Sequence, residues 1–305
     1  MACERRRHTG PARPSGLVVA GVLVLAVALL IFACGGENEG SSVTGTPTIG
    51  TPATTVGPEG GEALGTGTPS GEASPEPAPR LDLTYYGHSM FLFQSPGGVS
   101  ILIDPNSDIG YPKPTLPKID AVAVSHDHSD HNKVDVAGKD VRVLNGLQDG
   151  DWANIDETVG DVHIRTIPTF HDDQQGSQRG KNSMFLFDVN GMRLLFAGDL
   201  GHVLTDEQIA AAGDVYVLLL PVGGQFTIGP AEAKQVVEQL KPHVVVPMHY
   251  KTDVVSFSGS DELQSVDPFM ASMEGTTVIR QDTNFVNIEK APSPAAPIIL
   301  LMPYQ

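Results

Sequence analysis

The chain has 305 residues, of which 36 are Asp or Glu and 19 are Lys or Arg, so its formal net charge at pH 7 is −17. So acidic a chain has no evident basic surface for contacting phosphates, and nucleic acid is not an expected partner. Cys3 and Cys34 are the only cysteines, and both precede the globular part, which excludes a disulfide framework and thiolate metal ligands there.

The first 34 residues have the pattern of a lipoprotein signal or a membrane anchor. Arginines at residues 5–7 precede an uncharged run at residues 16–33, and a basic region followed by an apolar one is typical of export signals. The sequence Ile31-Phe32-Ala33-Cys34-Gly35 resembles a bacterial lipobox, in which the chain is cut before a cysteine that then carries lipid. An uncleaved transmembrane anchor is the alternative. Both interpretations place the rest of the chain outside the cytoplasm, attached to the membrane.

A linker and one domain follow. Residues 35–80 are mostly Gly, Thr, Pro, Ser, Glu and Ala, which bury too little apolar surface to fold, so we expect a disordered tether. Residues 81–290 have about the length of a single domain. Residues 291–305 contain an apolar run after a stretch rich in Pro and Ala, and we interpret them as a C-terminal tail that is able to pack back on the domain.

Apolar runs separated by turn signals predict a domain rich in strands. Strands are expected at residues 81–86, 90–93, 99–105, 119–124, 141–144, 162–168, 183–189, 192–197, 215–221 and 244–248. The pair Asn190-Gly191 suits the type I′ turn of a hairpin. A short helix is expected to end near residue 213, and residues 230–240 form a second helix with proline in its first turn and one apolar face. This order favours two packed sheets with helices outside.

The motif HxHxDH, formed by His126, His128, Asp130 and His131, directly follows the apolar run at residues 119–124. Three imidazoles and a carboxylate at the end of a strand can converge on one point, which is typical of a metal site. A single histidine in such a polar loop would usually be a solvated turn residue. A metal site is the better interpretation here, because ligand-type residues also follow later strands.

Three more ligand-type residues end later apolar runs: His171, Asp199 and His249. All seven side chains offer nitrogen or oxygen, a set that suits zinc, with manganese or iron as alternatives. Seven ligands are too many for one tetrahedral ion and fit two ions, about 3.5 to 4 Å apart, that share a bridging carboxylate. Such a pair activates a water molecule, so the expected reaction is hydrolysis.

The order HxHxDH, His171, Gly198-Asp199 and His249 resembles that of the metallo-β-lactamase superfamily of metal-dependent hydrolases. Shorter motifs look more narrowly like the branch that contains L-ascorbate-6-phosphate lactonase: Tyr86-Gly87-His88-Ser89, Ile103-Asp104-Pro105, residues 220–227 and Pro247-Met248-His249-Tyr250. The resemblance covers nearly all of residues 81–290. It implies an α+β fold, the αββα four-layer sandwich.

The resemblance also implies a role for each ligand. The first ion would be held by His126, His128 and His171, and the second by Asp130, His131 and His249, with Asp199 bridging the two. Asp130 would also be the catalytic residue that orients the attacking water. No thiolate occupies a ligand position, so the cysteine-containing zinc sites of true β-lactamases are not reproduced and antibiotic hydrolysis is not expected.

Five other residues have either a role at the site or a structural role. His88 follows a tight turn, and a role near the substrate or behind a ligand is balanced against a structural one. His202 is expected to be either a contact for substrate or metal or a plain loop residue. Asp104 is expected to support a metal-binding histidine from behind. His163 and His243 are expected to be structural.

Two classes of function stay open at this point. One is a membrane-tethered, extracytoplasmic hydrolase of a small molecule, with an ester or lactone as the expected substrate and a phosphodiester as the runner-up. The other is a non-catalytic lipoprotein that binds a metal or another ligand. Asp130 favours the enzyme, because a metal store does not need a carboxylate beside an activated water. Residues 172–181 are too polar for the core and are expected to form a loop beside the site.

Overall fold

The computed structural model describes residues 79–292 and 296–304. The expected signal or anchor at residues 1–34, and all but the last two residues of the expected linker, lie outside this part of the chain. Within the two described ranges, no helix has the length and apolar character needed to cross a membrane.

The first sheet is mixed and has six strands. In spatial order they are β15 (Phe285–Glu289), β1 (Arg80–Gly87), β2 (Met90–Gln94), β3 (Ser100–Ile103), β4 (Ala121–Val124) and β5 (Arg142–Asn145). Neighbours are antiparallel from β15 to β3, whereas β3, β4 and β5 are parallel. Alternate residues of β1, namely Leu81, Leu83 and Tyr85, are buried, as the two-residue period of a strand requires.

The second sheet has eight strands. In spatial order they are β14 (Thr277–Arg280), β16 (Ile298–Leu301), β13 (Val244–Met248), β12 (Val217–Pro221), β11 (Met192–Phe196), β10 (Lys181–Val189), β9 (Val162–Phe170) and β8 (Asp156–Val159). The strands from β14 to β11 are parallel, and those from β11 to β8 are antiparallel. Every residue of β12 and β13 is buried, as expected for central parallel strands covered on both faces. A separate short hairpin pairs β6 (Leu147–Gln148) with β7 (Asp151–Trp152).

The main core lies between the two sheets. Phe91 and Phe93 from β2 face Phe187 and Phe196 of the larger sheet, and all four side chains are fully buried. The rings of Phe93 and Phe187 stack with their centroids 5.5 Å apart. This interleaving of the two inner faces fixes one sheet against the other, so strand ends from both sheets are held at one shared edge.

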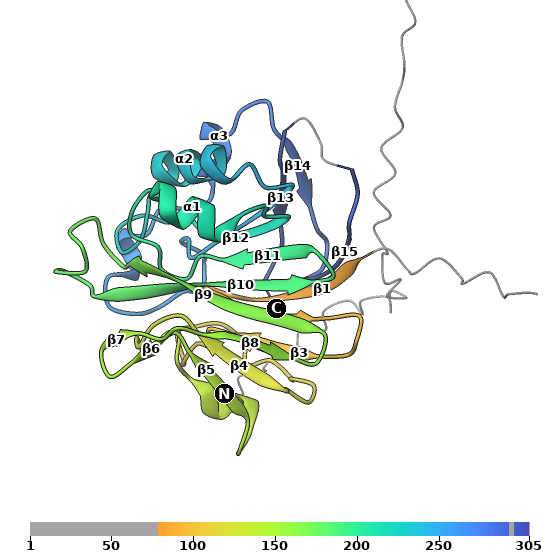
Figure 1. Cartoon of the computed structure of the whole chain (residues 1–305). Helices are drawn as coiled ribbons and strands as arrows, with labels where there is room; N and C mark the ends of the chain where they lie inside the picture. Colours follow the sequence, from red (N-terminus) through yellow and green to blue (C-terminus); the bar gives the residue numbers. More distant parts are fainter. Residues whose placement is uncertain (1–78, 293–295, 305) are drawn as a thin grey trace, which may run out of the picture. The chain divides into compact units, whose positions relative to one another are not determined.

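The α-helices of the described residues lie on the outer face of the larger sheet (Figure 1). They are α1 (Asp206–Ala212), α2 (Pro230–Leu240) and α3 (Asp267–Ser272). The buried face of α2 consists of Ala233, Val236, Val237 and Leu240. It shares an apolar cluster with Phe269 of α3 and Leu218 of β12. The helix expected at residues 230–240 and its apolar face are therefore confirmed.

The outer face of the six-stranded sheet carries no α-helix among the described residues, so the expected αββα sandwich lacks one of its helical layers. The 3₁₀ helix η1 (Val134–Ala137) and the loop residue Leu116 cover that face instead, packing against an apolar cluster that includes Leu102 and Val122. The connection from β4 to β5, residues 125–141, consists of the HxHxDH loop and this one 3₁₀ helix.

Some local elements agree with the sequence, whereas β8, β14, β15 and α3 are not among the expected elements. Asn190 and Gly191 both have positive φ, 50° and 75°, as the type I′ turn between β10 and β11 requires. The helix expected to end near residue 213 is α1, which begins after a capping box formed by Thr205 and Gln208. The segment at residues 291–305, expected to be a tail, contributes β16. This strand pairs in parallel with both β13 and β14, so the domain extends past residue 290.

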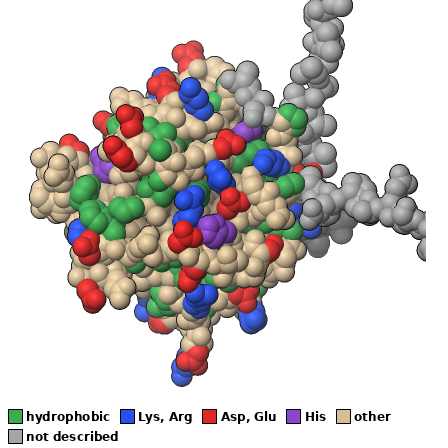
Figure 2. Space-filling model, viewed as in Figure 1, with side chains coloured by type: hydrophobic (Ala, Val, Ile, Leu, Met, Phe, Trp, Pro, Cys, Tyr) green, Lys and Arg blue, Asp and Glu red, His purple; other side chains and the backbone are tan. Residues whose placement is uncertain are grey.

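The strand ends that carry ligand-type residues meet at one edge. The strands β9, β11 and β13 run in the same direction, so their carboxyl ends share an edge of the larger sheet, and the loop after β4 reaches that edge from the other sheet. On the face shown in Figure 2, acidic and basic side chains are interspersed.

Candidate metal centre

The HxHxDH loop follows β4 and is anchored by a buried carboxylate. Asp104, at the end of β3, accepts the backbone N–H of Ser125 at 2.7 Å and the Ser125 hydroxyl at 2.5 Å. Its Oδ2 also accepts a hydrogen bond from Nδ1 of His131 at 2.8 Å, and Nδ1 of His126 donates to Oγ of Ser125 at 2.9 Å. Asp104 thus fixes the Nδ1 side of two histidines, one directly and one through Ser125, and directs their Nε2 atoms to the side where a cation could bind.

Two groups of ligand-type atoms result, each close enough to surround one ion. The first comprises His126, His128 and His171, and the second comprises His88, Asp130, His131 and His249. A third set, Asp104 with His126 and His131, overlaps both, but the Asp104 oxygens already accept hydrogen bonds from Ser125 and His131. In the first group Nε2 of His126 lies 3.0 Å from Nδ1 of His128. In the second Nε2 of His88 donates to Oδ2 of Asp130 at 3.1 Å. The first group is the one that the family resemblance implied, and the second contains the implied ligands together with His88.

Asp199 lies between the two groups. Its Oδ2 is 3.1 Å from Nε2 of His171 and 3.8 Å from that of His126 in the first group, and 3.2 Å from Nε2 of His249 and 3.4 Å from that of His131 in the second. Its other oxygen, Oδ1, is buried and has no hydrogen-bond partner among the described residues. A carboxylate in this place can serve both groups at once.

The turn that carries Asp199 is built from β10. The Oδ1 atom of Asn182 accepts the backbone N–H of Asp199 at 3.0 Å, and the Asn182 amide group donates to the carbonyl of Ala197 at 2.9 Å. Gly198 between them has φ +57°, and a Cβ there would stand 2.4 Å from Oδ1 of Asn182. The Gly-Asp pair therefore depends on glycine for both its conformation and its space.

Three other site residues adopt a backbone conformation that is unusual outside glycine. His88, Asp104 and His249 have φ values of +55°, +41° and +51°. Such residues cost about 1–3 kcal/mol each and concentrate at functional sites. The backbone N–H of His249 donates to the carbonyl of His88 at 3.0 Å, so two of the three strained positions hold each other. The surrounding fold offsets the energetic cost of these backbone conformations, which place the side chains at the site.

The electrostatics of the cluster keep its carboxylates charged. Burial opposes ionisation of Asp199, but the neighbouring His131, His249 and His171 hold its pKa well below the ordinary value. Burial likewise opposes ionisation of Asp130, yet the hydrogen bond from His88 and the charge of His131 lower its pKa. Burial, with the nearby His249, lowers the pKa of His88 to about 3. Against the effect of burial, Asp199 and the hydrogen bond with Asp104 hold the pKa of His131 well above its ordinary value. The buried carboxylates therefore favour positive charge at this point, which is a suitable environment for a cation.

The donor set fits divalent metal ions. Every ligand atom is a nitrogen or an oxygen, and His131 Nε2 and Asp199 Oδ1 are buried without hydrogen-bond partners in the described part of the chain. Buried polar atoms left unpaired are costly, and an ion at this point would satisfy both. The set suits zinc, manganese or iron.

The remaining histidines are accounted for by local contacts. The Phe170 backbone N–H donates to Nε2 of His202 at 3.1 Å, and Nδ1 of His202 donates to the carbonyl of Val203 at 2.9 Å, so both ring nitrogens are occupied. This is the loop alternative considered for that residue. His163 is exposed on β9 and bonds Asp156 at 2.7 Å. His243 stacks on Tyr216. The structural roles expected for His163 and His243 agree with these contacts.

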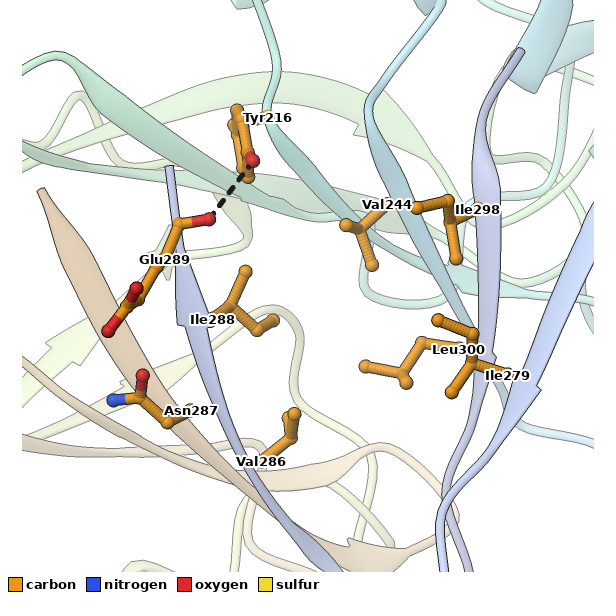
Figure 3. A pocket seen from close by; sticks show the side chains of 9 residues that line it. All are labelled: Tyr216, Val244, Ile279, Val286, Asn287, Ile288, Glu289, Ile298 and Leu300. Atoms are coloured by element: carbon orange, nitrogen blue, oxygen red, sulfur yellow. Dashed lines mark hydrogen bonds between the residues drawn. The ribbon is translucent and has the colours of Figure 1, made fainter. Parts of the chain in front are cut away.

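A hollow of about 230 Å³ opens above the candidate metal centre. Its wall includes His128, Asp130 and Asp199, together with Phe226 from the motif at residues 220–227. Arg179 and Phe257 also line it, and no pattern in the sequence singled them out. Only the loop of Arg179, at residues 172–181, was expected beside the site. A pocket elsewhere, shown in Figure 3, shares no lining residue with this hollow. Its wall is mainly apolar, contains no histidine and offers no set of metal ligands.

Comparisons with known proteins agree with this geometry. Residues 82–249 match the model of the beta-lactamase superfamily domain. A UPF0173 metal-dependent hydrolase of Myxococcus xanthus is 32% identical over 231 residues, which cover 63% of this chain and 81% of the relative. A second such protein, from Thermococcus kodakarensis, is 32% identical over 196 residues, covering 56% of this chain and 85% of the relative. The chain belongs to the UPF0173 metal-dependent hydrolases of the metallo-β-lactamase superfamily.

A solved structure supports the same assignment. A candidate Zn-dependent hydrolase of the metallo-β-lactamase superfamily from Thermotoga maritima has a TM-score of 0.54 and 32% sequence identity, and the match covers 74% of this chain and all of that one. Membership of this family explains the mixed sheets, the small number of helices and the His/Asp cluster at the sheet edge.

Proposed function

We propose that this family member is a membrane-tethered, extracytoplasmic hydrolase that uses two divalent ions, with zinc as the first choice, to cleave an ester or lactone bond in a small molecule. One observation carries the two-ion assignment. The Oδ2 atom of Asp199 lies 3.1 to 3.8 Å from the Nε2 atoms of four histidines that belong to two separate ligand groups. A shared carboxylate in that position is the arrangement that two-metal sites use.

The residues around the proposed ions have separate tasks. His126, His128 and His171 hold one ion, Asp130, His131 and His249 hold the other, and Asp199 bridges them. Bound there, the ions would lower the pKa of a water molecule and polarise the bond to be cleaved. Asp130 is one-fifth exposed, so it faces the hollow while its Oδ2 accepts the His88 hydrogen bond. This contact fixes the carboxylate that we propose orients the attacking water.

The choice of an ester or lactone rests on the sequence motifs. The Gly-His-Ser turn, the Ile-Asp-Pro strand end and the Pro-Met-His-Tyr strand end look like those of the L-ascorbate-6-phosphate lactonase branch. A hollow of about 230 Å³ suits part of a small molecule rather than a polymer. A phosphodiester is the alternative substrate, and the same donor set would serve it.

The location is proposed from the N-terminal pattern alone. A basic cluster, an uncharged run and a lipobox-like sequence ending at Cys34 support export and attachment to the membrane. The composition of residues 35–78 supports a tether between the membrane and the domain.

The direct test is elemental analysis of the purified full-length chain, combined with hydrolysis assays on a lactone, an aryl ester and a bis-aryl phosphodiester. Two ions per chain, with turnover that a chelator abolishes and zinc restores, is the expected result. The substrate cleaved best identifies the bond. A chain that binds no metal when metal is in excess would contradict the proposal.

Asp130→Asn separates a hydrolase from a metal store. The substitution keeps the shape of the side chain but removes its charge, so we expect at least one ion to stay bound and turnover to fall by about 100-fold or more. Two ions in the unsubstituted chain without turnover on any of the three substrate classes would support the non-catalytic binding protein instead.

A further inference from the structure

Arg179 occupies the mouth of the candidate metal centre. It lines the hollow above the ligand groups and also a neighbouring groove of about 400 Å³ that runs between the loop after β9 and the loop after β12. Among the described residues that line these two spaces, Arg179 is the one Lys or Arg. The chain has a net charge of −17, so Arg179 is the group at this point that can attract an anion.

The loop that carries Arg179 is held rigidly by Asp172, the residue after His171. The buried carboxylate of Asp172 accepts four backbone N–H groups, from Gln174, Gly176, Gln178 and Arg179, at 2.7 to 2.9 Å. The backbone N–H of His171 also donates to the carbonyl of Gly180 at 3.0 Å. The loop is therefore folded around the strand end that supplies a metal ligand, and the position of Arg179 is fixed relative to the site.

The guanidinium group is oriented by the opposite loop. Its Nη2 donates to the carbonyl of Gln225 at 2.9 Å, and its Cζ lies 5.4 Å from the centre of the Phe226 ring. No other hydrogen bond of the guanidinium to the described residues is present, and the side chain is half-buried. Arginine has five N–H donors in a planar fork, so most of them are available to a ligand in the hollow.

We propose that Arg179 binds an anionic group of the substrate, a carboxylate or a phosphate, next to the bond that is hydrolysed. This inference rests on the proposed hydrolase function and narrows its substrate class. The fork of arginine matches the two oxygens of such an anion. Asp173 and Glu232 line the outer groove and repel an anion there. In the hollow the proposed ions would offset the charges of Asp130 and Asp199, so the anion binds at the Arg179 end, nearest the metal centre. Neutral esters lack this contact.

A matched pair of substrates tests the proposal by kinetics. Mono-(4-nitrophenyl) glutarate carries a carboxylate where 4-nitrophenyl pentanoate carries a methyl group. In full-length Arg179→Gln we expect KM for the glutarate ester to rise about tenfold or more, with kcat little changed, because a hydrogen bond to a charged group has about that effect. KM for the pentanoate ester is expected to stay within about twofold. Arg142→Gln, which removes an exposed charge on β5 outside both spaces, is the control and should alter neither.

A binding measurement tests Arg179 without turnover. Calorimetric titration of the zinc-loaded full-length chain with phenylphosphonate, phenylacetate and neutral benzamide reports anion binding directly. We expect Arg179→Gln to weaken the binding of an anion about tenfold, Arg179→Lys to weaken it less, and Arg142→Gln to leave it unchanged. The anion that binds more tightly distinguishes phosphate from carboxylate chemistry.

The outcomes separate the two proposals. Anion binding that depends on Arg179, in a chain that hydrolyses no substrate, would support the subsite and contradict the hydrolase. Hydrolysis with equal KM changes for both esters, or equal anion binding by the unsubstituted chain and a folded Arg179→Gln, would overturn the subsite. Anion binding absent from the unsubstituted chain would overturn it as well. An unchanged melting temperature shows that the variants remain folded.

Discussion

Asp104 and His131 form a fully buried pair in which His131 donates from Nδ1 to Oδ2 of Asp104 at 2.8 Å. The oxygens of Asp104 are occupied by protein groups, because they accept three hydrogen bonds from Ser125 and His131. The histidine is consequently oriented with Nε2 toward Asp199. This is the pattern by which an outer carboxylate sets the tautomer and direction of a metal-binding imidazole.

Asp104→Asn should weaken metal binding without removing a proposed ligand. Asparagine keeps one acceptor oxygen, and its NH2 group can only donate. It cannot accept from both the Ser125 backbone N–H and Nδ1 of His131 as the carboxylate does, so His131 loses its fixed orientation. We expect zinc affinity to fall by about 10- to 100-fold, the usual effect of losing such a partner. Competition with a chromophoric chelator measures the change.

The control for this variant is Asp156→Asn. Asp156 bonds His163 at 2.7 Å in a pair of the same kind on the exposed surface of the domain. Its substitution should leave zinc affinity unchanged. Equal losses in both variants would mean that Asp104 does not act through His131.

Asp199→Ala tests the bridging position. Because its Oδ2 faces histidines of both ligand groups, its removal should release at least one ion. Turnover should fall by more than about 100-fold, the upper limit usual for losing a residue that only supports a metal ligand. Metal content and kcat of the purified variant are the measurements. His163→Ala should keep both ions and full activity, so an essential His163 with a dispensable Asp199 would show the ligand assignment to be wrong.

The candidate site could be predicted from the sequence largely because its ligands follow buried strands. Each of His126, His171, Asp199 and His249 ends or follows an apolar run, and strands that run in one direction bring such ends together. The strand-end position of Asp104 predicts that it lies behind a metal-binding histidine, and in the structure it bonds His131. The two ligand groups are thus consequences of strand order, which local sequence patterns reveal.

Other features depend on contacts that local patterns do not encode. β16 is only four residues long, and its place between β13 and β14 comes from non-local pairing, so the segment looked like a tail. The role of Arg179 depends on how residues 172–180 fold around Asp172, which composition does not specify. The connection from β4 to β5 contains one 3₁₀ helix in place of an α-helix. The resemblance implied the superfamily's four layers and gave no information on this connection.

Cys34→Ser tests the proposed attachment to the membrane. If Cys34 is the lipid-bearing residue, the variant should accumulate as an unprocessed precursor that takes up no labelled fatty acid. Gel mobility and metabolic labelling in expressing cells are the measurements. Cys3→Ser removes the other cysteine and should be processed normally. Unchanged processing and labelling of Cys34→Ser would exclude the lipoprotein and leave the uncleaved anchor.

Gly223→Ala should disturb the metal centre through the backbone of His249. A Cβ at residue 223 would stand 2.1 Å from the carbonyl oxygen of His249 and 2.9 Å from Cα of Tyr250. Backbone atoms cannot rotate away, so the ends of β12 and β13 must separate. We expect the free energy of unfolding to fall by about 2–3 kcal/mol, the upper part of the range for overpacking. Because His249 moves with its backbone, zinc affinity should fall too.

Gly229→Ala provides the comparison for this substitution. Gly229 is the N-cap residue of α2, and its nearest contact for a new Cβ is the flexible carboxylate of Glu232 at 3.2 Å. Loss of a tolerant cap residue costs about 1 kcal/mol, and the metal ligands stay in place. Urea unfolding and zinc titration of both variants therefore separate a steric effect on His249 from a general loss of stability. If both variants lost stability equally and bound zinc normally, the close approach of Gly223 to His249 would have no part in building the site.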